Sequence, residues 1–382
     1  MSMGKKTLRV FEAFSGIGAQ YSALEKAGLN FKIVGISDWF IDALIGYDAL
    51  HGKKSDLPKI PSREAQLKYL NKFCFSKDSV TPIKDLSRLS DSELTKLYIA
   101  NKRSKNLGSI LDIHGEDLIK LNIDLLIYSF PCQDLSTGGK TLGMKKGSGT
   151  RSGLLWEIER ILKEMKALGS LPKYLLLENV KTILAPSNRE DLNQWLRFLE
   201  KEMGYKKHHP MTLDASEFGV PQDRKRTIII SCLDEEIDIE SKLQRNKKYD
   251  ARDFVKNDYS NPVFKLEADQ ASLNPTPSRE AMWRINKRTL TKDTIFHTIT
   301  CNMDRSNNAG MLEYKLYKGR KYRLLTMREA FLLMGFKESD YEKIKALGFS
   351  YRKINKLIGN SIVVNVLASI FKTLYGGEYG KL

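Results

Sequence analysis

The sequence predicts an α/β fold: a doubly wound, mixed but mostly parallel sheet with a second, smaller domain. Apolar, β-prone runs alternate with helical patterns through the first half of the chain, as in parallel sheets. This alternation is lost between about residues 233 and 320, which points to a separate domain. A chain of 382 residues is long enough for one large unit and a smaller one.

The first strand, helix and second strand follow one another closely. Residues Leu8 to Phe14 are apolar and run into Gly16 and Gly18, and helical spacing then extends from Ala19 to Ala27. A second strand is predicted over Phe31 to Ser37. This order of strand, glycine turn and helix is typical of folds that bind a ligand at the carboxyl ends of their strands.

Further strands are predicted at Ile123 to Phe130, Tyr174 to Leu177 and Thr227 to Ser231. Polar clusters flank each of these runs, so several of the residues discussed below should meet at one edge of the sheet. The last helix, Ser361 to Tyr375, is strongly apolar and should pack back on the large sheet.

These patterns divide the chain into a catalytic domain over residues 1–232, a smaller domain over 233–320 and a return to the catalytic domain over 321–382. Residues 51–108 read as an insertion between the second and third strands. Helices are predicted within it at Arg63 to Phe73 and Asp91 to Lys102.

The charge balance favours an anionic partner. Lysine and arginine number 63 against 46 acidic residues, giving a formal net charge of +17 that will attract nucleic acid. A solvated lysine-rich surface is the alternative explanation. No run approaches the ~20 uncharged apolar residues of a membrane span, and the N-terminus lacks an export signal, so a soluble, cytoplasmic protein is expected.

Neither a disulfide framework nor a metal site is expected. The four cysteines, Cys74, Cys132, Cys232 and Cys301, lie far apart without a CxxC pair. The neighbouring His208 and His209 have no cysteine or carboxylate at ligand spacing. At least one cysteine is therefore free to have a chemical role.

The glycine turn indicates a particular class of ligand. A dinucleotide site would carry a third glycine three residues after Gly18, where this chain has Tyr21, so a pyrophosphate is disfavoured and a smaller, carboxylate-bearing ligand fits better. Asp38 could accept from ribose hydroxyls and Trp39 offers a surface for an adenine, although a helix cap and a buried aromatic remain an equal alternative. Asp112, which we predict to end the third strand, adds an acceptor for an exocyclic amine.

The sequence FPCQDLS, residues 130–136, places Cys132 just past a buried strand. A cysteine is usually a small buried hydrophobe, but here it stands at a ligand-facing strand end. The stretch Thr137 to Arg151 contains five glycines and several lysines, which suits a lid over a bound substrate. A disordered linker is the competing interpretation.

Two further clusters are expected at the same edge. Glu178 follows an apolar strand, and a carboxyl group partly buried there would be able to donate a proton, although such a residue is more often a surface acid. Strand alternation would point Gln222, Arg224 and Arg226 to one side, where they suit phosphates or a base edge. A solvated strand end is the alternative.

Taken together and in this order, these motifs resemble the DNA (cytosine-5) methyltransferase family of bacterial type. The resemblance rests on FSGIG, Asp38-Trp39, Asp112, FPCQDLS, RSGLLWEI, ENV, QDRKR, RLLTMREAFLLMGF at residues 323–336 and IGNSIVVNV at residues 358–366. It implies a Rossmann-like, S-adenosylmethionine-dependent methyltransferase fold, with residues 233–320 as the target-recognition domain. It also implies S-adenosylmethionine as cofactor, with S-adenosylhomocysteine as product.

The resemblance also assigns roles to residues. It implies a cofactor pocket formed by Phe14, Ser15, Gly16, Gly18, Asp38, Trp39, Asp112, Ile113, Leu154, Asn360 and Ser361. Cys132 would be the nucleophile, Glu178 would hold ring nitrogen 3 and the amino group of a flipped-out cytosine, and Arg226 would support the base. Gln222 and Arg224 would organise the pocket and the nearby backbone.

Double-stranded DNA is the expected partner, bound by a monomer that could work beside a restriction endonuclease. We expect DNA contacts from Thr137, Lys140, Thr298, Thr300, Asn302 and Arg305, and the stretch around residues 297–301 is most similar to members that recognise CG. Two features depart from the family: Asp38 stands where glutamate is usual, and the insertion at residues 51–108 is longer than in compact members.

Three other functions compete. A transfer-RNA cytosine-5 methyltransferase would share most motifs, but that branch carries a Cys-Phe-Thr tripeptide that this chain lacks. A catalytically silent DNA-binding relative would be expected to have lost Cys132 or the cofactor glycines. A nicotinamide oxidoreductase is opposed by the missing third glycine.

Overall fold

The computed structural model describes residues 6–135, 143–272, 274, 276–303, 311–315, 318–319 and 321–380. The chain divides into two compact units. The first comprises residues 1–213, 225–243 and 370–382, and the second comprises residues 214–224 and 244–369.

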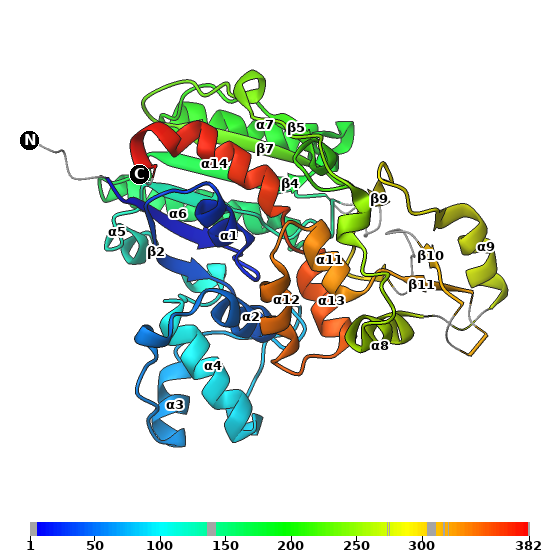
Figure 1. Ribbon diagram of the computed structural model, residues 1–382. Coiled ribbons are helices and arrows are strands. Elements are labelled where there is room, and N and C mark those ends of the chain that lie inside the picture. Colours follow the sequence, from blue (N-terminus) through cyan, green and yellow to red (C-terminus); the bar gives the residue numbers. More distant parts are fainter. Residues whose placement is uncertain are drawn as a thin grey trace, which may run out of the picture. The chain divides into compact units, whose positions relative to one another are not determined.

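The first unit is built on a six-stranded sheet in the order β2-β1-β3-β4-β7-β5 (Figure 1). Its strands are β1 (Leu8–Ala13), β2 (Phe31–Ser37), β3 (Leu125–Tyr128), β4 (Tyr174–Val180), β5 (Met211–Asp214) and β7 (Lys225–Cys232). Strands β1 to β4 pair in parallel, whereas β7 runs antiparallel to β4. The predicted mixed, mostly parallel sheet is confirmed.

Helices surround this sheet and supply its core. They are α1 (Ala19–Lys26), α2 (Ile41–His51), α3 (Arg63–Leu70), α4 (Asp91–Arg103), α5 (Gly115–Ile119), α6 (Leu155–Ala167) and α7 (Arg189–Arg197). A large cluster of buried side chains joins β3 and β4 to α6 and α7, with the fully buried Trp195 beside Tyr128. This packing fixes the ends of β3 and β4, where the predicted catalytic residues stand.

The inserted segment contains α3 and α4, close to their predicted limits. Ser90 and Glu93 form a capping box at the start of α4, which satisfies backbone N–H groups that the helix leaves unpaired. Both helices belong to the first unit, where α4 packs against α2.

One strand prediction was wrong. Asp112 does not end a strand: it closes a short 3-10 helix at Ile110–Asp112. The preceding chain pairs with β2 through an isolated bridge between Asn106 and Ile36, and it then turns at Gly108, whose φ is +84°. A turn so soon after the bridge prevents a longer strand.

The second unit contains small sheets and several helices. Its strands are β6 (Gln222–Asp223), β8 (Lys287–Arg288), β9 (Phe296–His297), β10 (Met311–Glu313) and β11 (Tyr322–Leu324). Its helices are α8 (Pro262–Ala271), α9 (Pro277–Asn286), α11 (Met327–Leu333), α12 (Glu338–Lys345), α13 (Tyr351–Gly359) and most of the first half of α14 (Val364–Tyr379).

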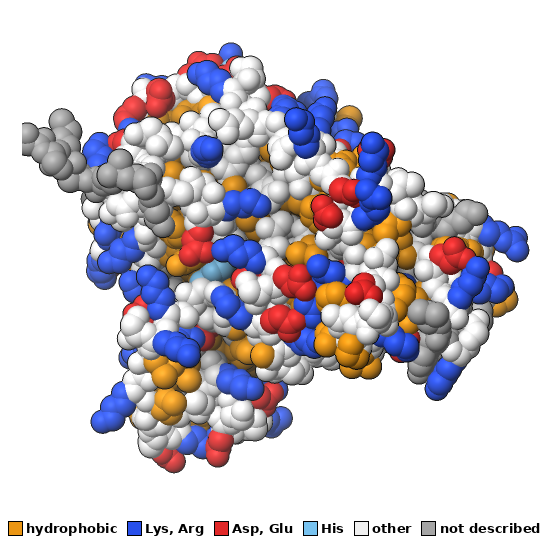
Figure 2. All heavy atoms as spheres, in the orientation of Figure 1, with side chains coloured by type: hydrophobic (Ala, Val, Ile, Leu, Met, Phe, Trp, Pro, Cys, Tyr) orange, Lys and Arg blue, Asp and Glu red, His pale blue; other side chains and the backbone are white. Residues whose placement is uncertain are grey.

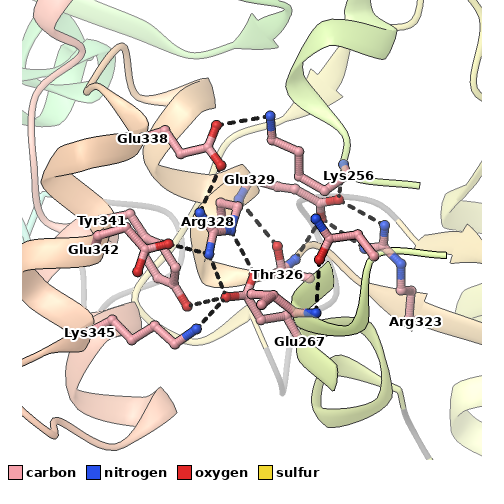
Figure 3. Close-up of polar contacts among 12 residues, drawn as sticks. Lys256, Glu267, Arg323, Thr326, Arg328, Glu329, Glu338, Tyr341, Glu342 and Lys345 are labelled. Atoms are coloured by element: carbon pink, nitrogen blue, oxygen red, sulfur yellow. Dashed lines mark hydrogen bonds and ion pairs between the residues drawn. The ribbon is translucent and has the colours of Figure 1, made fainter. Parts of the chain in front are cut away.

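A buried ionic network holds α8, α11 and α12 together (Figure 3). Arg328 binds both carboxylate oxygens of Glu267, at 2.8 and 2.9 Å, and Lys345 reaches the same carboxylate at 2.8 Å. Arg323 and Glu329 form a second, fully buried pair with two contacts of 2.8 Å. Charges this deep are tolerated because each is paired and hydrogen-bonded.

The predicted domain limits at residues 233 and 320 remain a prediction, because compactness does not show which segment reads DNA. Of the predicted return over residues 321–382, the part from residue 370 belongs to the first unit. There Tyr375 of α14 lies against Tyr174 of β4, with ring centroids 5.1 Å apart, as expected for a helix that packs on the sheet.

The expectation about membrane spans needs a correction. In the described part of the chain, the helical stretch Tyr351–Tyr379 is long and apolar enough to cross a membrane by length and composition alone. However, 61% of its apolar window is buried inside the protein. The apolar side chains therefore serve as core residues here.

Candidate active site

The glycine turn after β1 has the strained backbone that its sequence predicts. Phe14, Gly16 and Gly18 all have positive φ, at 57°, 56° and 76°. A Cβ on Gly18 would also lie 2.6 Å from Nε2 of His51, so this position requires glycine for space as well as for conformation. His51 Nε2 is 3.0 Å from the carbonyl oxygen of Ile17, within the same turn.

Asp38, at the end of β2, is bound to this turn. Its carboxylate accepts hydrogen bonds of 2.8 Å from the backbone N–H groups of Gly16 and Phe40. Burial raises the pKa of Asp38 to about 6, although these N–H donors act in the opposite direction. The acid is therefore held at the mouth of the glycine turn and is ionised at neutral pH.

Other residues of the predicted cofactor pocket belong to the same unit. The Ser15 hydroxyl is buried and has no hydrogen-bond partner among the described residues, which suits a group that bonds to a ligand. Trp39 is half-buried, Ile113 is buried, Leu154 packs against the core and Asp112 is exposed. A cofactor that carries a nucleoside fits these features: the unpartnered hydroxyl of Ser15, the glycine turn with its positive φ values, and the partly exposed indole of Trp39.

Cys132 lies just beyond β3 in a loop that is fastened on both sides. Asn179 Nδ2 donates to the carbonyl of Phe130 at 3.0 Å, and the Ser152 hydroxyl donates to the carbonyl of Pro131 at 2.7 Å. Asp134 accepts from the backbone N–H of Arg151 at 2.8 Å. The half-buried cysteine is thus carried on a rigid support rather than on a free loop.

These supports were not assigned roles from sequence. Asp134, Ser152 and Asn179 all stand inside the motifs quoted above, so the signal was present, but hydrogen bonds between distant segments cannot be read from spacing.

Glu178 stands at the end of β4, beside the cysteine loop. Its carboxylate accepts a hydrogen bond from Ser129, the residue that follows β3, and its other oxygen lies 3.4 Å from Nε of Arg226. The side chains of Glu178 and Arg226 are only 5% and 17% exposed. Antiparallel pairing of β7 with β4 brings Arg226 opposite Val180, which explains how residues distant in sequence meet.

Gln222 and Arg224 do not share a continuous strand with Arg226. Gln222 belongs to β6, which pairs with β9, whereas Arg226 belongs to β7, which pairs with β4. The predicted single face of three polar side chains is therefore wrong, because the chain changes partner at Arg224. Gln222 and Arg224 also lie in the second unit and are buried.

Gln222 and Arg224 both form hydrogen bonds with the backbone of Ile299 in that unit. Gln222 Oε1 accepts from the N–H of Ile299 at 3.0 Å, and Arg224 donates to the carbonyl of Ile299 at 2.7 Å. Arg224 also donates to the carbonyls of Gly359 and Ser361, at 3.1 and 2.7 Å. The two side chains organise backbone rather than face solvent.

Of the residues predicted to read DNA, Thr298 donates its hydroxyl to the carbonyl of Asp223 at 2.6 Å, and the Thr300 hydroxyl accepts from the N–H of Asn302 at 3.4 Å. Thr298 and Thr300 are half-buried on either side of Ile299, and Asn302 is exposed. Asn360 and Ser361 follow α13 in the second unit, so their part in the cofactor pocket stays a prediction. Thr137, Lys140 and Arg305 lie outside the described residues. Part of the predicted lid lies there too, but Met144 is bound to Trp156 of α6 by a hydrogen bond of 2.7 Å.

Among the described residues, no group of three or more histidine, cysteine or acidic side chains could hold a metal ion. His208 and His209 diverge: His208 lies 3.0 Å from the Ser231 hydroxyl, and His209 contacts Glu236. Burial lowers the pKa of His208.

A glycine turn that binds Asp38, beside strands that end near a cysteine and a carboxylate, is typical of α/β proteins that bind a ligand at the carboxyl ends of their strands. Solved structures of similar fold include S. pombe Dnmt2, with a TM-score of 0.64, 18% identity and coverage of 97% of this chain and 99% of that chain. Entamoeba histolytica EhMeth gives a TM-score of 0.64 at 16% identity, over 98% and 99% of the two chains.

Relatives found by sequence have a higher identity to this chain than these solved structures. The orphan methyltransferase M.SssI of Spiroplasma monobiae is 37% identical over 97% of this chain and 98% of its own length. The type II methyltransferase M2.ScrFI of Lactococcus lactis subsp. cremoris is 34% identical over 97% and 100%. The family model for C-5 cytosine-specific DNA methylases matches residues 86–376.

The chain belongs to the C-5 cytosine-specific DNA methylase family and is a DNA (cytosine-5) methyltransferase. Membership implies S-adenosylmethionine as methyl donor and DNA as substrate. It also favours DNA over the transfer-RNA alternative.

Proposed function

We propose that Cys132 is the nucleophile of this methyltransferase, that Glu178 holds a proton at ring nitrogen 3 of the cytosine, and that Arg226 supports the base. The observation that carries the proposal is the pair of hydrogen bonds that connects the end of β3 to the end of β4. Asn179 fastens the cysteine loop at Phe130, while Ser129 binds Glu178. A nucleophile and a proton donor on neighbouring, rigid strand ends are what addition to the ring requires.

The chemistry explains why both groups are needed. Carbon 5 of cytosine is a poor nucleophile until the Cys132 thiolate adds to carbon 6 and the electrons of the 5,6 double bond move into the ring. A proton shared with Glu178 at nitrogen 3 neutralises the charge that develops there. Once carbon 5 carries the methyl group, loss of its proton to water or hydroxide re-forms the double bond and expels the thiolate.

S-adenosylmethionine supplies the methyl group when bound and becomes S-adenosylhomocysteine. In this proposal Phe14, Ser15 and the glycines line its pocket, and Asp38 accepts from the ribose hydroxyls. Trp39 stacks on the adenine, with Asp112, Ile113, Leu154, Asn360 and Ser361 as the remaining contacts. The unpartnered hydroxyl of Ser15 supports this assignment.

The DNA substrate is proposed to be a short duplex sequence, with CG as the expected site. Flipping the cytosine out of the duplex costs a few kcal/mol, which contacts from the basic surface would offset. Figure 2 shows lysine and arginine side chains spread widely over the visible face, in line with the net charge of +17. A monomer acting in the cytoplasm, with or without a restriction endonuclease, completes the proposal.

Specific reading is assigned to Thr298, Thr300 and Asn302. Support comes from Gln222 and Arg224, which hold the backbone of Ile299 between the two threonines at 3.0 and 2.7 Å. A fixed backbone lets neighbouring side chains discriminate between bases, since readout depends on hydrogen-bond geometry.

The test is methyl transfer from tritiated S-adenosylmethionine to duplex DNA and, separately, to transfer RNA. Cys132→Ser is compared with the wild type, and Cys232→Ala serves as the control because Cys232 pairs with Tyr174 at the opposite end of β4. Label on carbon 5 of DNA cytosine, lost only with Cys132→Ser, supports the proposal, and bisulfite sequencing then gives the site. Label on transfer RNA alone, or label that survives Cys132→Ser, overturns it.

A further inference from the structure

The inserted segment is connected to the proposed cofactor acid by a chain of buried amides. The backbone N–H of Asp38 donates to Oδ1 of Asn106 at 2.9 Å, and Nδ2 of Asn106 donates to Oδ1 of Asn101 at 2.7 Å. Nδ2 of Asn101 then donates to the hydroxyl of Tyr69 at 3.1 Å. This series of hydrogen bonds therefore runs from α3, through α4, to Asp38, the residue that follows β2.

Burial makes each hydrogen bond of this series costly to lose. Asn101 and Asn106 are 0% and 2% exposed, so an amide that lost its partner could not turn to water instead. Leu107 reinforces the contact, because its N–H donates to the carbonyl of Ile36 in β2 at 2.9 Å. The backbone of Asp38 is thus set by the insertion, while its carboxylate is set by Gly16 and Phe40.

A second connection fixes the chain around Trp39. The N–H of Ser76 donates to the carbonyl of Trp39 at 2.7 Å, and the N–H of Ile41 donates to the carbonyl of Ser76 at 3.0 Å. Ser76 is fully buried, and its hydroxyl donates to the carbonyl of Thr81 at 2.7 Å. A loop of the insertion therefore binds the backbone on both sides of Phe40, directly after the proposed adenine-stacking residue Trp39.

The same loop lies near Asp112. Burial and the charge of Asp112 together raise the pKa of the Cys74 thiol, which is two residues before Ser76. Phe73 packs against Gly108, where an added Cβ would lie 3.3 Å from its side chain. The loop at residues 73–76 thus contacts the backbone of Trp39 through Ser76 and packs through Phe73 on Gly108, four residues before Asp112.

We propose that the insertion is a working part of the cofactor site, in which Asn106 and Asn101 position Asp38 and the Ser76 loop positions Trp39. This rests on the cofactor assignment made above. The insertion acts through these residues and does not touch the reacting atoms. Its amides are therefore positioning residues for nucleoside binding.

The test is calorimetric binding of S-adenosylhomocysteine to the full chain, with methyl-transfer kinetics beside it. Asn106→Ala should weaken binding roughly tenfold, because it removes a buried hydrogen bond at the cofactor acid. The KM for S-adenosylmethionine should rise by a similar factor while kcat at saturating cofactor stays within about twofold. A purely structural role would lower the active fraction, and so kcat, without changing KM.

Two other variants keep the test decisive. Tyr69→Phe removes only the far end of the chain and should weaken binding about two- to threefold even if Asn106→Ala does not fold. Ser104→Ala is the matched control: Ser104 is buried in the same segment, but the bond of its hydroxyl is made to its own helix, at the carbonyl of Ala100. It should bind like the wild type.

The possible failures are distinguishable. Binding to folded Asn106→Ala and Tyr69→Phe that equals the wild type, while Asp38→Ala is weakened, overturns the inference and leaves the proposed function standing. A wild-type protein that does not bind S-adenosylhomocysteine overturns both.

Discussion

Arg226 holds Nε 3.4 Å from one carboxylate oxygen of Glu178, while Ser129 donates to the other oxygen. The carboxylate is 5% exposed and therefore has a fixed direction. A group held between a cation and a hydroxyl is pre-organised to meet a ring nitrogen without rearrangement. This pairing is the structural basis of the proposed mechanism.

Glu178→Gln should lower kcat by about 10²- to 10⁴-fold, because an amide keeps the shape of the side chain but cannot share a proton with ring nitrogen 3. Binding of S-adenosylhomocysteine should be unchanged, and single-turnover methylation assays measure the loss. Glu159→Gln is the control, since the Glu159 side chain is also shielded and is paired with Lys146 and with Lys163 of α6. Equal rates for Glu178→Gln and wild type would remove Glu178 from the mechanism.

Cofactor affinity should depend on pH through Asp38. The pKa of its carboxyl group is raised to about 6 by burial, so lowering the pH through 6 protonates the acid and weakens its acceptance from the ribose. The Kd for S-adenosylhomocysteine should rise roughly tenfold between pH 7.5 and pH 5. Asp38→Asn should bind S-adenosylhomocysteine weakly, with a Kd that hardly changes with pH. A wild-type Kd that changes equally little with pH would contradict the assignment of Asp38 to the cofactor site.

Glu12 should make the protein less stable as the pH rises from about 4.5 towards 8. This carboxyl group of β1 is fully buried, and neither oxygen makes a hydrogen bond of ordinary geometry among the described residues. Burial raises its pKa to about 8, and the nearby Tyr47 and Tyr21 offset only part of the effect. Because the unfolded chain ionises near 4.5, the folded protein loses stability as pH rises from 4.5 towards 8.

The stability of Glu12→Gln relative to the wild type should therefore increase as the pH rises. The difference between their free energies of unfolding should grow by about 3 kcal/mol from pH 5 to pH 8, as measured by urea denaturation. A difference that is constant with pH would show that Glu12 is ionised, or solvated, in the folded state.

Removing one partner of the buried pair in the second unit should be costly. Arg323 and Glu329 are both 0% exposed, so Glu329→Gln leaves an uncompensated guanidinium and should cost about 3–5 kcal/mol. Asp250→Asn breaks the pair with Arg252, whose side chain is 61% exposed, and should change the free energy of unfolding far less, because solvent screens an exposed pair. Denaturation curves of the two variants give the comparison, and similar losses would argue against a structural role for the buried pair.

Local patterns were enough to predict five of the six strands of the large sheet, but not the short strand at Met211–Asp214. The strand at Phe31–Ser37 matches its predicted limits, and those at Leu8–Ala13 and Tyr174–Val180 differ at their ends only, because buried parallel strands read as continuous apolar runs. The helices at Arg63–Leu70 and Asp91–Arg103 also lie where periodicity placed them. The predicted and observed ends of these elements differ by one to three residues because caps and turns set the ends, and periodicity does not encode them.

Tertiary pairing was not predictable in the same way. Alternation assigned Gln222 and Arg226 to one strand, but sheet partners change between them, and a partner change leaves no periodic signal. Asp112 was predicted to end a strand, whereas a positive φ at Gly108 turns the chain first. The amide chain through Asn101 and Asn106 joins polar residues within a helical, Lys-rich segment, and nothing in their spacing distinguishes them from surface asparagines.

The nucleophile can be tested most directly with duplex DNA in which the target cytosine carries fluorine at carbon 5. Fluorine cannot leave as a cation in place of the carbon-5 proton, so the final elimination is blocked after methyl transfer and the enzyme should stay attached to the base. We predict one DNA-linked peptide by mass spectrometry, joined through Cys132, and none from Cys132→Ser. A link through Cys301 or another residue, or no covalent complex at all under conditions of active methylation, would contradict the mechanism.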